Sequence, residues 1–329
     1  MTASSTHDSL PEVSVVVPAR NCAGLIEDCL ASIGRQSYRG SMDVTVALGP
    51  SHDDTAAVLA RCAPVMRIRV VDNPSGTTPA ALNLAVAASS GTVVARVDAQ
   101  SRLAPDYIEQ AVATLARTGA ANVGGIQRPL ATGGGAGAIA AAMSSPFGAG
   151  PASFRRGGRE GPVDTVYLGV FDREALISVG GFDEALERNQ DYELNWRLRR
   201  RGYTVWLDPS LVVDYVPRSS LTGLAKQYYG YGAYKRAVVS RHPGSLRPRQ
   251  LAAPALVAGL AVSAAALGAR RWAGAVLPVA YGAACAASAI RLQSELPEPG
   301  DRLQAAAAFA TMHLSWGAGF LAGRTRRRR

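Results

Sequence analysis

Short runs of β-branched residues alternate with helix-forming stretches between residues 13 and 97, and this alternation most narrows the possible folds. Strands are predicted at Val13–Val17, Val44–Leu48, Ile68–Val71 and Thr92–Val97. Helices are predicted between them, at Ala23–Ser37, Asp54–Cys62 and Pro79–Ala88. Strand–helix–strand repeats of this kind build a parallel sheet covered by helices. The chain is therefore expected to contain an α/β domain.

Composition and charge exclude several other classes of protein. Apolar residues make up 48% of the chain and charged residues 18%, which is typical of neither a disordered chain nor a fibre. The only lysines are Lys226 and Lys235, and neither lies in the Gly-Lys-Ser/Thr sequence of a phosphate loop. The four cysteines form no Cys-x-x-Cys pair, which argues against a zinc ribbon or a disulfide scaffold.

The composition changes near residue 217, where a basic and aromatic segment leads into three apolar stretches. Residues 218–250 are expected to form an interfacial helix, since tyrosines mixed with basic residues suit the depth of lipid headgroups. Each of the stretches Leu251–Ala269, Ala273–Ile290 and Ala305–Gly323 approaches the ~20 residues that cross a bilayer; a soluble helical bundle is the alternative. The expected domains are a disordered N-terminus at 1–12, an α/β domain at 13–217, two or three transmembrane helices within 251–323, and a basic tail at 324–329.

Basic residues flank this apolar region on both sides and bear on its orientation. The net charge is +10, and the basic residues concentrate before the first apolar stretch and at Arg324 and Arg326–Arg329. Anionic membrane lipid is therefore the expected partner, and nucleic acid is not. The positive-inside tendency places both basic groups in the cytoplasm, which three spans cannot achieve, so either one stretch lies in the interface or re-enters, or the tendency fails. A multi-pass cell-membrane protein with a cytoplasmic α/β domain is expected.

Three motifs follow one another along the α/β region. Ser14-Val-Val-Val-Pro-Ala-Arg-Asn21 is a strand with a polar turn, Asp98 follows the strand Thr92–Val97, and Asn189-Gln-Asp-Tyr-Glu-Leu-Asn195 opens a predicted helix. In this order they resemble the family 2 inverting glycosyltransferases of GT-A fold, most closely the membrane-anchored polysaccharide-assembly branch typified by succinoglycan glucosyltransferases. The resemblance covers about residues 12–240. It implies a Rossmann-like, mixed but mainly parallel sheet flanked by helices, followed by a C-terminal helical membrane region.

The resemblance implies a divalent cation, Mg²⁺ or Mn²⁺, that neutralises the leaving diphosphate of a nucleotide-sugar donor. The family holds this cation with an Asp-x-Asp motif after a strand, since hard cations prefer carboxylate oxygens. Here the motif reads Asp98-Ala99-Gln100, so a neutral amide replaces the second carboxylate. Asp98 and Gln100 are the expected metal ligands, and the missing charge puts metal dependence in question. In the simpler alternative, Asp98 caps the following turn.

The resemblance also supplies a candidate general base. An inverting transfer needs one carboxylate that removes a proton from the acceptor hydroxyl as this group attacks the sugar. The family carries an acidic residue at the start of a helix that faces the donor, and Asp191 matches this position. A carboxylate near a helix N-terminus also stabilises the helix through its dipole, and the two roles are compatible.

The remaining expected donor-binding residues lie in loops and on one helix: Pro18, Arg20, Asn21, Asp53, Asn83, Arg155 and Arg156, together with Asp98. Relatives contact the nucleotide after the first strand and from the helix that holds Asn83. Asp53 is the partial match to a base-binding run, with helix capping as an equal alternative. The arginines lie in a long loop expected at residues 131–162, and guanidinium groups suit phosphate oxygens. A UDP-sugar is the favoured donor, although the usual uracil contact has no clear counterpart.

The expected function is that of a membrane-bound inverting glycosyltransferase of the bacterial cell envelope. It would move a sugar from a nucleotide sugar to a lipid-linked or polysaccharide acceptor at the cytoplasmic face. A polyprenyl-phosphate sugar synthase is one alternative, because it would share the domain and the membrane attachment. A catalytically inactive sugar-nucleotide-binding membrane protein is the other, supported by the altered Asp98-Ala99-Gln100 motif.

Overall fold

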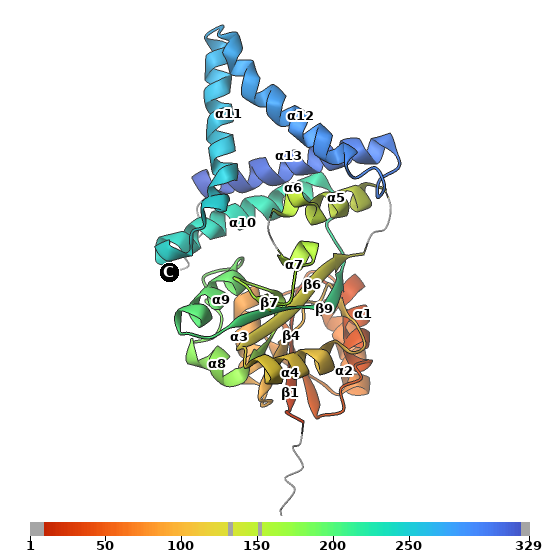
Figure 1. Ribbon diagram of the computed structural model, residues 1–329. Helices are drawn as coiled ribbons and strands as arrows, with labels where there is room; N and C mark the ends of the chain where they lie inside the picture. The colour runs from red at the N-terminus through yellow and green to blue at the C-terminus, as the bar shows by residue number, and fades with distance from the viewer. Residues whose placement is uncertain (1–9, 131–133, 151–152, 324–329) are drawn as a thin grey trace, which may run out of the picture. The chain divides into compact units, whose positions relative to one another are not determined.

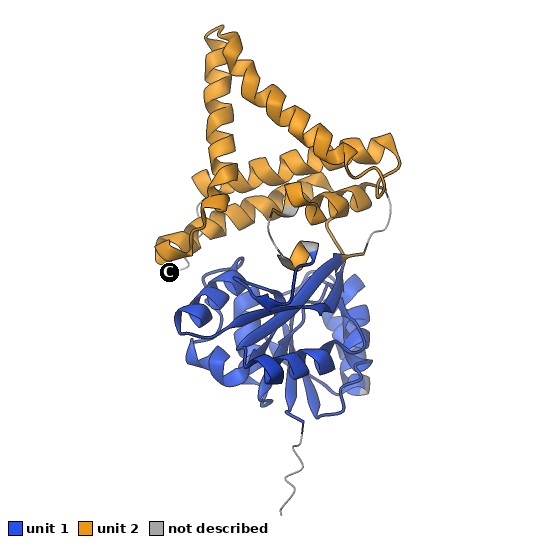
Figure 2. Cartoon of the chain, in the orientation of Figure 1, with its two compact units in different colours: residues 1–128, 157–215 blue, residues 129–156, 216–329 orange. Residues whose placement is uncertain are grey.

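A computed structural model describes residues 10–130, 134–150 and 153–323. Most of the expected disordered N-terminus, and the basic tail at 324–329, lie outside the described residues. The chain divides into two compact units. Unit 1 comprises residues 1–128 and 157–215, and unit 2 comprises residues 129–156 and 216–329 (Figure 2).

Unit 1 is built on one nine-stranded sheet in the order β3-β2-β1-β4-β8-β6-β9-β5, with β7 paired to β9 (Figure 1). Strands β1 to β4 run parallel to one another, and β8 continues the sheet antiparallel to β4. The strands are β1 (Val13–Ala19), β2 (Met42–Leu48), β3 (Ile68–Asp72), β4 (Val93–Arg96), β5 (Ser101–Leu103), β6 (Asn122–Pro129), β7 (Gly161–Pro162), β8 (Tyr167–Asp172) and β9 (Val205–Tyr215).

Helices cover both faces of this sheet. One hydrophobic cluster joins Val15 and Val17 of β1 to α1 (Ala23–Gly34), α2 (Thr55–Met66) and α4 (Tyr107–Thr118). A second cluster joins Val16 and Val94 to α3 (Thr78–Ala87), α8 (Arg173–Ser178) and α9 (Gln190–Arg200). Both faces of β1 are thus buried, which explains its nearly continuous run of valines. The predicted mixed, mainly parallel α/β fold is confirmed.

The structure differs from the expected elements at β9. The sequence predicts two short strands here, near Thr204–Leu207 and Leu211–Tyr215. The structure instead contains one strand, Val205–Tyr215. Asp208 accepts hydrogen bonds from the Ser210 backbone N–H (2.9 Å) and hydroxyl (2.6 Å), so the side chain satisfies local donors while the backbone stays extended.

Apart from the last residue of β6, the regular elements in the described part of unit 2 are helices. Its helices are α5 (Gly134–Ser144), α6 (Pro146–Ala149), α7 (Ser153–Arg156), α10 (Leu221–Arg241), α11 (Ala252–Gly268), α12 (Val276–Ile290) and α13 (Pro299–Ala322), with short 3-10 turns at Pro243–Ser245, Pro248–Leu251 and Trp272–Ala275. The long loop expected at 131–162 therefore contains three helices. Its alanines favour helix, and Ile139 and Met143 are buried in a cluster with Phe309 and Met312 of α13.

Helices α10 and α13 pack closely because small residues lie where they meet. A Cβ atom at Gly319 would lie 2.1 Å from the carbonyl oxygen of Tyr229, and one at Gly232 would lie 2.0 Å from that of Trp316. The backbones approach each other at these two positions, as in helix pairs that use small interface residues. The third apolar stretch is therefore packed against other helices of its own unit.

Replacing Gly319 with alanine is expected to lower the free energy of unfolding by about 1–3 kcal/mol, because the added methyl group overpacks the contact between α10 and α13. Thermal unfolding in detergent micelles measures the effect. Gly282→Ala is the matched control, because no atom lies within 4 Å of a Cβ at that helical position. Equal melting temperatures for the two variants would contradict the close contact.

Candidate active site

The carboxyl ends of the parallel strands β1, β2 and β3 are joined by hydrogen bonds between their loops. The Arg20 guanidinium follows β1 and donates to the carbonyl oxygens of Pro50 (3.2 Å) and Gly76 (2.9 Å). Asn21, with a left-handed φ of 48°, donates from its backbone N–H to Ser51 (3.1 Å). Parallel strands present their carboxyl ends at one edge, which is where such sheets bind ligands. Pro18 lies within β1 beside this edge.

Asp53 acts as a hydrogen-bond acceptor within this group of loops. One carboxylate oxygen accepts from the Ala23 backbone N–H at the start of α1 (3.0 Å), and the other accepts from the Thr55 hydroxyl (2.6 Å). These hydrogen bonds lower the pKa of Asp53, and the bond from the Thr55 hydroxyl has the largest effect. Asp53 thus makes contacts of the kind expected from a helix-capping residue. A direct contact of Asp53 with a donor base stays a prediction.

A buried arginine lies at the end of β4. The Arg96 guanidinium forms a two-pronged ion pair with Asp98, with Nε 3.0 Å from Oδ1 and Nη2 3.2 Å from Oδ2. The Arg96 side chain is 7% exposed and that of Asp98 is 21% exposed. Burial alone would lower the pKa of Arg96, but the charges of Asp98 and Asp191 raise it above its ordinary value. Arg96 therefore interacts electrostatically with both predicted carboxylates, which come from distant parts of the sequence.

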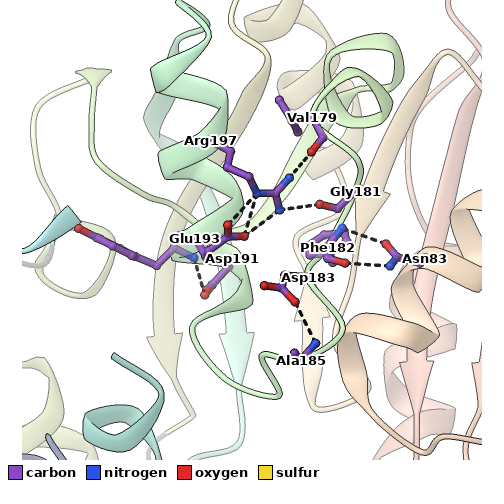
Figure 3. Close-up of polar contacts among 10 residues, drawn as sticks. Asn83, Val179, Gly181, Phe182, Asp183, Ala185, Asp191, Glu193 and Arg197 are labelled. Carbon is purple, nitrogen blue, oxygen red and sulfur yellow. Dashed lines mark hydrogen bonds and ion pairs between the residues drawn. The ribbon is translucent and has the colours of Figure 1, made fainter. Parts of the chain in front are cut away.

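Asp191 lies in the first turn of α9 (Figure 3). Asn189 precedes the helix with a left-handed φ of 59°. One Asp191 oxygen accepts from the Tyr192 backbone N–H at 2.8 Å. The carboxylate is thus held at the amino end of a helix, where the helix dipole favours negative charge. The predicted base and the predicted cation ligand belong to the same unit and share the charge of Arg96.

The same helix supports the loop that packs against Arg96. Glu193, whose side chain is 2% exposed, forms an ion pair with Arg197 at 2.8 Å. Arg197 also donates to the carbonyl oxygens of Val179 and Gly181, which lie in the loop before α9 (Figure 3). Glu193 therefore serves loop structure and differs in role from Asp191, two residues earlier.

Asn83 holds the next residue of this loop. Its amide nitrogen donates to the Phe182 carbonyl oxygen (2.9 Å) and its amide oxygen accepts from the Phe182 N–H (2.9 Å) (Figure 3). The Phe182 ring centroid in turn lies 5.9 Å from the Arg96 guanidinium carbon. Both the nitrogen and the oxygen of the Asn83 amide form hydrogen bonds with Phe182, so Asn83 stabilises the loop that holds Phe182. Its predicted contact with the nucleotide stays a prediction.

Strand β8 supplies a tyrosine beside Asp98. The Tyr167 hydroxyl lies 3.1 Å from the Ser101 hydroxyl. Burial, together with the negative charge of Asp98, raises the pKa of Tyr167 well above its ordinary value, so the phenol stays neutral. The next residue, Leu168, has a φ of 60°, which is strained for a bulky side chain. Strained residues of this kind are frequent at functional sites.

The residues at the end of β4 fit a divalent cation only in part. Each Asp98 oxygen accepts one hydrogen bond from Arg96, which leaves further lone pairs, and Gln100 is exposed. The described residues contain no group of three or more His, Cys, Asp or Glu side chains that could hold a metal ion. Asp98 and Gln100 can thus offer two oxygens, and a cation that takes about six needs the others from a bound ligand and water.

The two loop arginines belong to unit 2. Arg155 lies in α7, with its guanidinium carbon 5.6 Å from the Phe154 ring centroid. The side chain of Arg156 lies outside the described part of the chain. Their predicted contact with a diphosphate stays a prediction.

Sequence reasoning missed Arg96, although the sequence carries a signal for it. Arg96 is the one charged residue in the apolar run Val93-Val-Ala-Arg-Val97. A charge inside a buried strand needs a partner, and the nearest carboxylate along the chain is Asp98. The sequence thus predicts that Arg96 is paired with a carboxylate, but it does not predict which other side chains surround the arginine.

Comparison with known proteins decides the family. The model of the family described as "Glycosyl transferase family 2" matches residues 14–180. The chain belongs to glycosyl transferase family 2. It is 32% identical over 321 residues to the succinoglycan biosynthesis protein ExoA of Rhizobium meliloti (strain 1021), covering 96% of each protein. The family assignment makes the chain a glycosyltransferase and confirms the resemblance carried by its three motifs.

More distant relatives extend over much of this family 2 chain. A Methanococcus voltae enzyme named as a dolichyl N-acetyl-alpha-D-glucosaminyl phosphate 3-beta-D-2,3-diacetamido-2,3-dideoxy-beta-D-glucuronosyltransferase is 24% identical over 240 residues, covering 70% of this chain and 74% of that protein. The solved structure of a Pyrobaculum calidifontis mannosyltransferase, in complex with GDP-Man and Mn²⁺, has a TM-score of 0.63 at 23% identity and covers 93% of this chain and 89% of its own. This likeness supports the fold.

Glu193→Gln is expected to lower the free energy of unfolding by about 3 kcal/mol, because it leaves the charge of Arg197 without its buried partner. Chemical denaturation of the purified protein measures the loss. Arg128→Gln is the control, since it breaks an ion pair whose arginine is 63% exposed and should cost less than about 1 kcal/mol. Similar losses for the two variants would contradict the supporting role of Glu193.

Proposed function

We propose that the chain is an inverting glycosyltransferase that moves a sugar from a nucleotide-sugar donor to a hydroxyl group of a lipid-linked or polysaccharide acceptor. One observation carries the proposal: Arg96 forms an ion pair with Asp98 and interacts electrostatically with Asp191. Two carboxylates from distant segments are thus available at one site. One can support the charge of the leaving group, and the other can accept a proton.

Asp191 is the general base in this proposal. It accepts the proton of the acceptor hydroxyl as the oxygen forms a bond to the anomeric carbon of the donor sugar. The bond from that carbon to the diphosphate oxygen breaks, and its electron pair leaves with the nucleoside diphosphate. Attack from the face opposite the leaving group inverts the anomeric configuration.

Asp98 would hold a divalent cation, Mg²⁺ or Mn²⁺, with Gln100 as the second ligand from the chain. When bound, the cation would neutralise negative charge on the departing diphosphate. The 21% exposure of the Asp98 side chain and the exposed Gln100 support this assignment. The Mn²⁺ in the structure of the Pyrobaculum mannosyltransferase supports it from a neighbour of the same fold.

The relatives support the choice of acceptor. ExoA is named for succinoglycan biosynthesis, and the Methanococcus enzyme is named for a sugar carried on dolichyl phosphate. A polysaccharide or lipid-linked glycan is therefore the proposed acceptor class. For the donor, the motif resemblance favours a UDP-sugar, whereas the Pyrobaculum structure holds GDP-Man. A test of transfer needs both nucleotide classes.

Asp191→Asn is expected to lower the rate of sugar transfer by about 10²- to 10⁴-fold, because the amide cannot accept the proton. Membranes that contain the protein would be incubated with labelled UDP- and GDP-sugars to measure transfer. Asp106→Asn, at an exposed carboxylate before α4, is the matched control and should transfer at the parent rate. Unchanged transfer by Asp191→Asn would refute the base assignment. A product that is a lipid monophosphate sugar would identify a polyprenyl-phosphate sugar synthase instead.

We also propose that α11 and α12 form a membrane hairpin. Among the described residues, two helices are long and apolar enough to cross a membrane, Pro248–Gly268 and Trp272–Ile290. Only 11% and 17% of their most apolar windows are buried, so these helices do not resemble the core of a soluble domain. Val262 is 70% exposed, Trp272 82% and Val279 68%. Apolar surface of this extent favours lipid as its neighbour.

The third apolar stretch supports a two-span arrangement. It lies in α13, whose Ala305, Ala308 and Phe309 are buried against α5, α10 and α12 in the core of unit 2. Two spans return the chain to the side from which it entered. Basic residues before α11 and after α13 can then both lie in the cytoplasm, as the positive-inside tendency favours. Arg270 and Arg271, in the turn between the spans, would lie at the opposite surface.

Single cysteines in a background without the native cysteines test this topology. In intact spheroplasts, a membrane-impermeant maleimide is expected to label Ala269→Cys, in the turn between the spans, because that turn faces outward. Ser240→Cys, exposed on α10, should react only after the membrane is opened. Labelling of both variants from the same side would contradict the hairpin.

A further inference from the structure

Strand β4 is a buried apolar strand that carries one charged residue. All four residues of Val93–Arg96 are buried. Side chains alternate along a strand, so Val94 and Arg96 project toward the same side. Val94 packs in the cluster that contains Leu194 of α9. The guanidinium is therefore directed to the side of the sheet that α9 covers, and Asp191 lies in the first turn of that helix.

Arg96 is fixed in this position. Its two-pronged bond to Asp98 determines the plane of the guanidinium, and the Phe182 ring packs beside it at 5.9 Å. Asn83 holds the Phe182 backbone through two hydrogen bonds. Moving Arg96 away from Asp98 would leave an uncompensated buried charge, which is strongly unfavourable. The ion pair between Arg96 and Asp98 is therefore a fixed structural feature of the site.

The Nη1 atom of Arg96 is also informative. It is buried and has no hydrogen-bond partner among the described residues. A buried donor without a partner is costly, so the arginine is held here by its charge interactions and packing rather than by complete hydrogen bonding.

At Asp98 itself one positive and one negative charge are paired, while Asp191 adds a second negative charge at longer range. The positive charge of Arg96 offsets the negative charge of Asp98, and Gln100 is neutral. A hard divalent cation binds through negatively charged oxygens, and a fixed positive charge beside the ligand repels it. At Asp98 the chain therefore offers a cation less electrostatic attraction than an unpaired carboxylate would. A diphosphate would bring both the missing negative charge and further oxygen ligands.

We propose that Arg96 is a built-in counter-cation that prevents Asp98 from retaining a divalent cation by itself, so that the cation is held only together with the diphosphate of the donor. The inference rests on the proposed function of Asp98 as a cation ligand. It assigns Arg96 a positioning role, because Arg96 acts through Asp98. The resting site then stays free of tightly bound metal, and the cation and the donor occupy it jointly.

Mn²⁺ binding to the full chain in detergent, followed by electron paramagnetic resonance, tests this inference without any transfer reaction. The parent protein should bind Mn²⁺ alone weakly, and at least about tenfold more tightly in the presence of UDP or GDP, after correction for Mn²⁺ bound by free nucleotide. Arg96→Gln should bind Mn²⁺ alone at least about tenfold more tightly than the parent, because the repelling charge is gone. Arg96→Lys keeps the charge and should behave as the parent.

The direction of the change separates this role from a structural one. Loss of a merely structural ion pair would loosen Asp98 and weaken Mn²⁺ binding, so weaker or unchanged binding by a cooperatively melting Arg96→Gln protein overturns the inference. Arg128→Gln removes an exposed arginine of the same unit and should leave Mn²⁺ binding unchanged. If Arg96→Gln fails to fold, the parent protein decides: tight binding of Mn²⁺ alone, or no binding even with nucleotide, overturns the inference. Absence of sugar transfer would count against the proposed function without altering these results.

Discussion

The ion pair between Arg96 and Asp98 is the interaction on which the candidate site depends. A guanidinium at the end of an apolar strand is tolerated only where carboxylates balance its charge. Asp98 provides that balance through direct contact, and Asp191 contributes at longer range. One positive charge thereby allows two negative side chains to share a small region, where they would otherwise repel each other. The chemistry proposed for the site needs both of them.

The surroundings of this ion pair are supplied by segments far apart in the chain. Helix α9 presents Asp191 and also, through Glu193 and Arg197, binds the loop at 179–181. Asn83 of α3 binds the same loop at Phe182. A change at Glu193, Arg197 or Asn83 would therefore be expected to move the Phe182 ring, which packs beside Arg96. The proposed base and the supporting ion pair are coupled because both lie on the same helix, α9.

Much of the fold and part of the site follow from local sequence. The strands β1 to β4 and the start of α9 were predictable because apolar periodicity and turn residues act locally. Asp98 and Asp191 were predicted from the motif order of the resemblance to follow a strand and to open a helix, and the structure confirms these positions, while their chemical roles stay predictions. Arg96 was not predicted, because a local pattern does not show what packs around a buried charge. Helix α5 was missed because its Gly- and Ala-rich sequence becomes helical here by packing against α13.

The division of the chain into two units has a practical consequence for shortened proteins. The backbone passes between the units near residues 128, 156 and 215, so unit 2 is made of two separate segments. Ending the chain after β9 would remove α10 to α13 but leave α5 attached to unit 1. Ile139 and Met143 would then lose the apolar partners that bury them. A soluble form of the sheet domain would therefore need residues 129–156 replaced by a short polar linker as well.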